Sequence, residues 1–280
     1  FVAWPLASAL AFGFYEWNGS ARGAFVGFRN FIDVLAGSHF GPVTWRAFAH
    51  NVVVFVALTI VQAGGGFLLA WLLYKEPFGH RAHRVIVFLP VILSTIIVGF
   101  LWKLLLHPNF GIVNQALQTV GLGGLARPWL GDSMTALPAL VLVNAWHWVG
   151  FPALVFLAGM QRIPRELIES ARLDGVSEWQ LVRTIVWPLT AQSATIVLTL
   201  MFIGAFNWFE LPYVMAGLDG SPFGSTDVLG LHFYRLAFGN QSGGVQDFGR
   251  GSAVAALLFL FIAVVASWMT VRLRRREIEA

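Results

Sequence analysis

Apolar residues in this chain gather in long blocks instead of recurring at the spacing of an amphipathic helix or strand. Five blocks contain no Asp, Glu, Lys or Arg: Val52–Tyr74, Val85–Trp102, Ser133–Gln161, Thr184–Phe209 and Gly251–Val271. A helix needs about 20 mainly apolar residues to cross the hydrocarbon of a bilayer, whereas a β-barrel strand needs about ten that alternate in polarity. The blocks therefore predict membrane-spanning helices.

A shorter apolar run, Phe1–Tyr15, predicts one more span. Because the sequence does not begin with Met, we expect it to begin inside this span. A signal peptide is not expected, since no basic region precedes the apolar residues. The predicted fold is all-α and integral to the membrane, with six transmembrane helices in a single domain, residues 1–280. We expect the spans at about residues 1–15, 50–74, 85–106, 134–159, 188–213 and 251–272.

Prolines interrupt several of these spans. Pro90 falls in the third, Pro138 and Pro152 in the fourth, and Pro212 at the end of the fifth. Proline lacks a backbone donor, so each is predicted to bend its helix. Such bends suit either packing alone or a helix bundle around a pathway. In the segment before the second span, Phe28, Phe31, Ile32 and Leu35 have the spacing of an amphipathic helix on the membrane surface.

Composition and charge predict how the chain is oriented in the membrane. Hydrophobic residues make up 57% of the chain, charged residues 11%, and the mean hydropathy is +0.71, which excludes an ordinary soluble domain. The connections Lys75–Arg84 and Arg162–Arg183 and the tail Arg272–Ala280 hold 11 of the 18 Lys and Arg residues. The positive-inside rule therefore places these segments, and both termini, in the cytoplasm. The net charge of +4 thus reflects membrane topology, and no nucleic-acid partner is expected.

One connection is unusually charged, in the stretch ELIESARLDGVSEWQLVRTIVWPL. Pro164 suits a first helical position, Gly175 a left-handed helix end, and Ser177 with Gln180 a capping box. These signals predict two short amphipathic helices joined by a glycine elbow. From the residues alone, the segment is either an ordinary structured loop or a docking site for a soluble partner.

This segment resembles the EAA loop of permease subunits of binding-protein-dependent ABC importers. That motif reads Glu-Ala-Ala, three residues, Gly, nine residues, Ile, one residue, Leu-Pro, and the spacing here is the same. Ser170 replaces Ala and Trp187 replaces Leu. The resemblance marks these residues for coupling to an ATPase: Glu169, Ser170, Ala171, Arg172, Asp174, Gly175, Ile185 and Pro188. The stretch FLPVILSTIIVGFLWKLLLHPNFGIVNQAL also resembles carbohydrate permeases of the maltose and glycerol-3-phosphate uptake type.

The resemblance implies the type I importer permease fold in a bacterial or archaeal inner membrane. The implied partners are a second homologous permease subunit, two cytoplasmic ATPase subunits, an extracytoplasmic solute-binding protein or lipoprotein, membrane lipid and the sugar. The chain itself is not expected to be an enzyme. A phosphate-binding loop needs Gly-Lys-Ser/Thr, and the two lysines, Lys75 and Lys103, follow Tyr and Trp. ATP and Mg are expected on the partner ATPase, and no cofactor on this chain.

Polar groups inside spans tend to face a cavity or a partner. Sugars are bound by hydrogen bonds to hydroxyls and by stacking on aromatic rings, so polar and aromatic neighbours form a candidate substrate pathway. Its residues are Asn144, Trp146, His147, Trp148, Asn207, Trp208, Glu210 and Tyr213. The alternatives are interfacial aromatic belts and a histidine that bonds to a neighbouring helix. No catalytic residue or metal site is expected, since only His80 and His83 form a close histidine pair.

Few cations lie near the predicted pathway. Lys103, Arg235 and Arg250 are the only ones, which favours neutral mono-, di- or oligosaccharides as the solute. The alternatives are an ABC importer permease for glycerol phosphate or an amino acid, and an ion-coupled secondary transporter. A purely structural membrane scaffold is a further alternative. Secondary transporters usually carry intramembrane carboxylates and inverted repeats, and here only Glu210 approaches a span.

Overall fold

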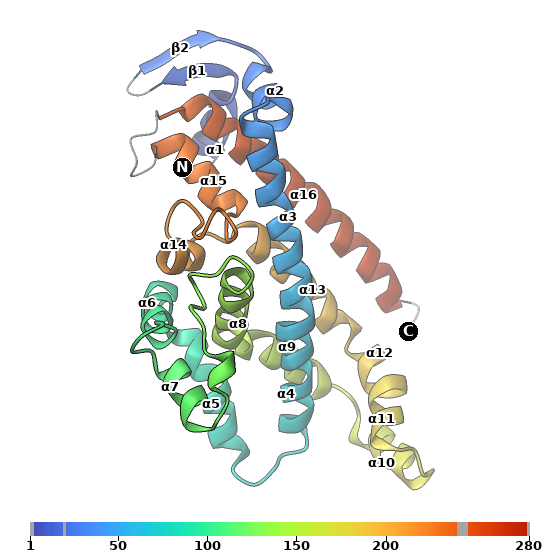
Figure 1. Cartoon of the computed structure of the whole chain (residues 1–280). Helices are drawn as coiled ribbons and strands as arrows, with labels where there is room; N and C mark the ends of the chain where they lie inside the picture. The colour runs from blue at the N-terminus through green and yellow to red at the C-terminus, as the bar shows by residue number, and fades with distance from the viewer. Residues whose placement is uncertain (1–2, 19–20, 240–245, 279–280) are drawn as a thin grey trace. The chain divides into compact units, whose positions relative to one another are not determined.

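The computed structural model describes residues 3–18, 21–239 and 246–278, which are mainly helical (Figure 1). The α-helices are α1 (Ala3–Phe12), α2 (Arg29–Ala36), α3 (Phe40–Leu58), α4 (Gly64–Tyr74), α5 (His80–Ile92), α6 (Thr95–Leu105), α7 (Ile112–Thr119), α8 (Ala136–Trp148), α9 (Gly150–Met160), α10 (Arg165–Leu173), α11 (Glu178–Leu181), α12 (Trp187–Leu189), α13 (Ala191–Phe206), α14 (Glu210–Ala216), α15 (Leu229–Phe238) and α16 (Phe248–Ile278). The strands are β1 (Tyr15–Asn18) and β2 (Ala21–Phe25). Two π-helical turns, Thr59–Ala63 and Val182–Val186, and a 3-10 turn, Gly123–Leu125, complete the elements.

The chain divides into two compact units. The first comprises Phe1–Phe55, Thr95–Val143 and Gly204–Ala263, and the second Val56–Ser94, Asn144–Ile203 and Val264–Ala280. Four of the five boundaries between the units fall inside helices, namely α3, α8, α13 and α16, so no linker-like composition marks them. The sequence therefore carries no boundary signal, and the single membrane domain stays a prediction.

Five of the predicted spans have counterparts among the described residues. The helices Phe40–Tyr74 and Phe248–Arg274 are each long and apolar enough to cross a membrane. Three bent pairs meet the same criterion together: α5 with α6 at 97°, α8 with α9 at 45°, and Glu178–Leu189 with α13 at 72°. α1 has 10 residues, about 15 Å of helix, which is roughly half of a bilayer's hydrocarbon thickness. The first span stays a prediction.

Two of the four prolines lie beside bends, as predicted. α5 ends two residues after Pro90, and the 97° bend follows. Pro152 lies in the first turn of α9, directly after the 45° bend. Pro138 and Pro212 lie in the first turns of α8 and α14. A backbone N–H there has no acceptor within its own helix, so these prolines break no bond inside α8 or α14, and the bends predicted for them stay a prediction.

A β-hairpin precedes α2, and the all-α prediction missed it. Its strands pair antiparallel, with Tyr15 opposite Phe25 and Trp17 opposite Arg22. The buried Asn30 of α2 donates from Nδ2 to the carbonyl oxygens of Gly13 and Tyr15, both at 2.9 Å. α2 itself confirms the predicted amphipathic helix. The hairpin and α2 are therefore held together by polar contacts of one side chain.

Close packing of α4 on α9 forms the centre of the second unit. A Cβ at Gly66 would lie 2.9 Å from the side chain of Pro152, so only glycine allows this approach. Phe67 of α4 meets Phe156 of α9 edge to face, with ring centroids 5.3 Å apart. The packed pair of α4 and α9 thus forms the base from which the segment after Met160 extends.

Candidate functional site

The coupling segment, residues 162–187, contains the two short helices that its sequence predicts. α10 ends in a Schellman motif: Gly175 N–H donates to Arg172 O and Val176 N–H to Ala171 O, both at 3.1 Å, with Gly175 at φ +78°. α11 begins with a capping box between Ser177 and Gln180. The predictions for Gly175, Ser177 and Gln180 are confirmed.

The start of α10 differs by one residue from the prediction. Pro164 is the N-cap, with extended backbone at ψ 131°, and the first helical residue is Arg165. Proline fits this position because an N-cap makes no intrahelical bond through its own N–H. The acidic Glu166 lies in the first turn, where the helix dipole favours a negative charge.

The coupling segment turns an apolar side inwards and a mixed side outwards. Ile168 and Ala171 are buried. The predicted coupling residues Glu169, Ser170, Arg172, Asp174 and Gly175 are exposed, while Ile185 and Pro188 are half-buried. Leu173 and Trp179 are also exposed, at 89% and 71% of their surface. Two large apolar side chains beside unpaired acids are typical of a surface that another protein covers.

Trp187, the departure from the family motif, packs where the segment returns to apolar sequence. Its ring meets Phe67 of α4 edge to face, at 5.1 Å between centroids. The π-helical turn Val182–Val186 precedes Trp187, and the Trp187 side chain is half exposed. The larger aromatic residue thus links the end of the coupling segment to α4 within the second unit.

An ion cluster ties α11 to the end of α4. Glu178 accepts from Lys75 Nζ at 2.7 Å and from Arg172 Nη2 at 3.1 Å. The hydrogen bond from Lys75 holds the pKa of Glu178 below its usual range, with smaller contributions from Arg172. A second, looser ion pair joins Arg165 to Glu76 at 3.9 Å. Sequence reasoning missed these pairs because Lys75 and Glu178 lie about a hundred residues apart.

Half of the predicted pathway residues lie in the second unit, on α8. Asn144 and His147 are buried: Asn144 donates to Gln62 Oε1 at 3.4 Å, and His147 Nε2 lies 3.0 Å from Leu93 O. Trp146 and Trp148 are 41% and 38% exposed. The structure therefore gives His147 a neighbouring-helix partner, the alternative to a solute contact, and leaves the two tryptophans accessible.

The other half lies in the first unit, around the break between α13 and α14. Asn207, Glu210 and Tyr213 are exposed, whereas Trp208 is buried. Phe209 stacks on Tyr213 at 5.4 Å and on Tyr234 of α15 at 5.1 Å between ring centroids. Exposed polar groups thus lie beside an ordered row of aromatic rings.

A buried ion pair in the first unit was not predicted. Arg235 of α15 donates to both carboxylate oxygens of Asp227, at 2.8 and 2.6 Å, and the Asp227 side chain is 1% exposed. Arg46 of α3 lies 3.6 Å from the same carboxylate. Desolvation and the nearby guanidinium of Arg235 lower the pKa of His232 to about 4, while Thr44 Oγ1 lies 3.0 Å from its Nε2. Side chains eight residues apart in one helix lie about 12 Å apart along its axis and do not pair, so the spacing of Asp227 and Arg235 gave no signal for this contact.

Known proteins extend the resemblance over the whole chain. Residues 43–278 match the model of the family described as "Binding-protein-dependent transport system inner membrane component". The "Probable ABC transporter permease protein YurN" of Bacillus subtilis is 31% identical, over 97% of this chain and 90% of that protein. The "Trehalose/maltose transport system permease protein MalF" of Thermococcus litoralis is 32% identical, over 85% of this chain and 76% of that protein.

A solved structure gives the same fold. It is a bacterial ABC transporter described as importing the acidic polysaccharide alginate; one of its chains superimposes with a TM-score of 0.79 at 23% identity, over 98% of this chain and 90% of that one. The type I importer permease fold predicted from the sequence is confirmed, and the chain is a multi-pass membrane protein. Together, the match over residues 43–278 and the EAA-type coupling segment show that this chain belongs to the family of binding-protein-dependent transport system inner membrane components.

Proposed function

We propose that this chain is a permease subunit of an ABC importer for neutral carbohydrates, driven by ATPase subunits on separate chains. The coupling segment carries the proposal, because its exposed surface combines Leu173 and Trp179 with unpaired acidic groups. No basic side chain lies within ion-pair distance of Glu169 or Asp174 in the part of the chain that the structure describes. Such a surface suits a cleft with apolar walls and a basic residue on a soluble partner.

The neutral solute follows from how cations in the first unit are used. Arg235 is paired with Asp227, and Arg250 with Asp33 at 2.8 Å and with Asp247 at 2.5 Å. Two of the three cations near the predicted pathway are thus paired with acidic side chains of the same chain. A phosphate or carboxylate on the solute would need free cations, which supports a neutral sugar. The Thermococcus relative is described as a trehalose/maltose permease, which agrees with this proposal.

The mechanism is a lever. Closure of two ATPase subunits on ATP pulls the docked coupling segments of this chain and a second, homologous permease together. α9 precedes the segment and α13 follows it, so both helices tilt and turn the pathway from inward- to outward-facing. An extracytoplasmic solute-binding protein delivers the sugar. The chain lies in a bacterial or archaeal cell membrane with both termini in the cytoplasm.

The chain contains no Cys, so single cysteines report cleanly on this arrangement. Ser170→Cys and Asp174→Cys should cross-link to the ATPase in complexes that import labelled maltose. Gln118→Cys, on the exposed surface of α7, is the matched control and should not. An impermeant maleimide added to intact cells should label Gln118→Cys and spare Ser170→Cys. Cross-linking to ATPase from Gln118→Cys, or none from Ser170→Cys in an importing complex, would overturn the proposal.

A further inference from the structure

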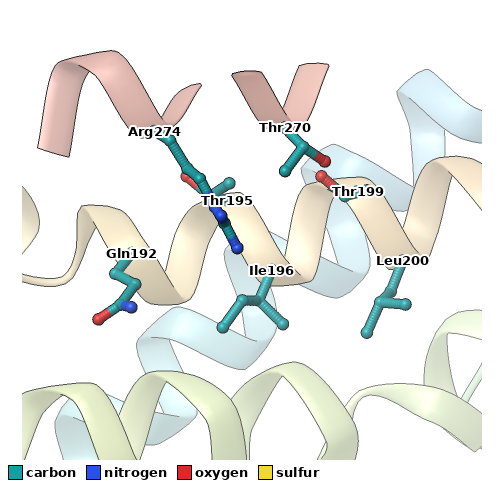
Figure 2. A pocket seen from close by; sticks show the side chains of 7 residues that line it. All are labelled: Gln192, Thr195, Ile196, Thr199, Leu200, Thr270 and Arg274. Atoms are coloured by element: carbon teal, nitrogen blue, oxygen red, sulfur yellow. The ribbon is translucent and has the colours of Figure 1, made fainter. Parts of the chain in front are cut away.

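A groove of about 240 Å³ lies between α13 and α16 in the second unit (Figure 2). It is lined by Gln192, Thr195, Ile196, Thr199, Leu200, Thr270 and Arg274. Figure 2 shows Arg274 reaching from α16 towards Thr195 of α13, with Thr199 and Thr270 further along the two helices. The lining therefore combines a guanidinium, an amide and hydroxyl groups with the aliphatic side chains of Ile196 and Leu200.

The cation at the mouth of the groove is available to a ligand. Arg274 is exposed, and no carboxylate lies within ion-pair distance of it among the side chains that the structure describes. Arg272, two residues earlier, instead lies over the Trp268 ring at 5.9 Å. A guanidinium presents five N–H donors in a fork that suits phosphate oxygens.

Hydrogen-bond donors continue the polar end of the groove. The exposed amide of Gln192 lies in the first turn of α13. The Thr199 hydroxyl is buried and has no hydrogen-bond partner within the described residues. Thr195 and Thr270 already donate to backbone oxygens one turn back, Ala191 O at 3.1 Å and Ala266 O at 2.8 Å. Gln192 and Arg274 are thus the exposed donors left for a ligand.

The groove extends along α13. Gln192 and Leu200 are eight residues apart on α13, which is about 12 Å along the helix axis. Ile196 and Leu200 are each nearly half exposed, so they give the groove an apolar surface along α13. In the proposed topology the Arg274 end faces the cytoplasm. Basic pockets between transmembrane helices on that side are suited to anionic headgroups.

We infer that this groove binds an anionic phospholipid of the inner leaflet. The phosphate lies against Arg274 and Gln192, and an acyl chain follows Ile196 and Leu200. The inference rests on the proposed membrane orientation but not on the identity of the solute. Four arginines in the last nine residues of the sequence add attraction to the anionic leaflet. A lipid held there would join the helix after the coupling segment to the C-terminal helix.

The test is lipid binding to the delipidated, fully assembled transporter by native mass spectrometry. Phosphatidylglycerol and phosphatidylcholine with the same acyl chains are titrated against wild type, Arg274→Gln and Arg272→Gln. We expect wild type to prefer phosphatidylglycerol, Arg274→Gln to weaken its binding at least fivefold, and Arg272→Gln to change it less than twofold. If both variants lost phosphatidylglycerol binding equally, the preference would come from general surface charge, and the inferred binding site would be refuted.

A second pair of variants keeps every charge. Ile196→Trp should fill the groove and weaken phosphatidylglycerol binding to the same extent as Arg274→Gln. Val264→Trp, at an exposed position of α16 outside the groove, should not. Competition by millimolar inorganic phosphate alone, or a groove closed to lipid by the second permease, would refute the inference. Sugar uptake measured in parallel separates the two proposals, because lipid selectivity can fail while import continues.

Discussion

Gly175 offers the sharpest test of the coupling segment. Its φ of +78° is left-handed, and a Cβ built there would meet no atom within 4 Å. A substitution is therefore penalised by backbone conformation alone and not by a clash. The left-handed region costs an ordinary L-residue about 1–2 kcal/mol, and a β-branched residue more, whereas Asn tolerates it well.

That penalty acts on the two Schellman bonds that close the elbow between α10 and α11. A loss of 1–2 kcal/mol shifts the equilibrium between the closed elbow and open forms about 5- to 30-fold towards the open forms. Import per ATP hydrolysed should therefore fall in the order Gly175→Asn, Gly175→Ala, Gly175→Val. Membrane insertion and complex assembly should stay normal, since Gly175 is exposed and packs on nothing.

The assay is labelled-sugar uptake and ATP hydrolysis in proteoliposomes containing the complete transporter. Gly121→Val is the matched control, because Gly121 has φ +79° and equally empty surroundings but lies after α7. Its substitution carries the same backbone penalty outside the coupling segment and should leave import per ATP unchanged. Equal import by Gly175→Val and Gly175→Asn would refute the elbow as the coupling element.

Three further predictions concern charges and protons. Asp227→Asn leaves the Arg235 guanidinium without its bidentate partner, so the complex should lose about 3 kcal/mol of stability, seen as a lower melting temperature. Glu178→Gln should lower thermal stability slightly at pH 7, by less than about 1 kcal/mol because the pair is exposed. Because the pKa of Glu178 is lowered in the folded state, this difference from wild type should be lost as the pH falls through that lowered pKa and the carboxylate becomes protonated. His232, with a pKa of about 4 beside Arg235, Asp227 and Arg46, is neutral in the folded state, whereas an unfolded histidine binds a proton below about 6.5. Stability should therefore fall between pH 6.5 and 4, and His232→Gln should flatten that slope; an unchanged slope would contradict it.

Sequence features whose residues lie within one turn of each other were predicted correctly. The cap at Ser177 and the left-handed glycine at position 175 both depend on bonds inside a single turn, so the sequence contains all that they need. The boundary at Pro164 was wrong by one residue, since proline fits both the N-cap and the first helical position. The hairpin was missed although the sequence contains Asn18-Gly19, a dipeptide typical of tight hairpin turns.

Long-range pairs could not be predicted in the same way. The Asp227 carboxylate meets Arg46 across 181 residues of sequence, and Lys75 meets Glu178 across 103. Neither separation has a helical period, and one sequence gives no covariation to reveal it. The candidate pathway residues were chosen by polarity and aromatic character, which does not distinguish a buried His147 from an exposed Glu210.

The use of charge connects these observations. In the first unit, charged groups neutralise each other: Asp227 with Arg235, and Arg250 with Asp33 and Asp247. The buried Asp227–Arg235 pair fixes the loop before α15, while the Arg250 pairs are partly exposed. Among the acids of the coupling segment, Glu178 is paired with Lys75 and Arg172, whereas Glu169 and Asp174 are exposed without a basic partner among the described side chains. Unpaired acids on a small, well-capped helix gain most when another surface supplies the cation. The charge distribution thus predicts that reversing Glu169 to Lys disrupts ATPase docking, and that a reversed partner residue restores it.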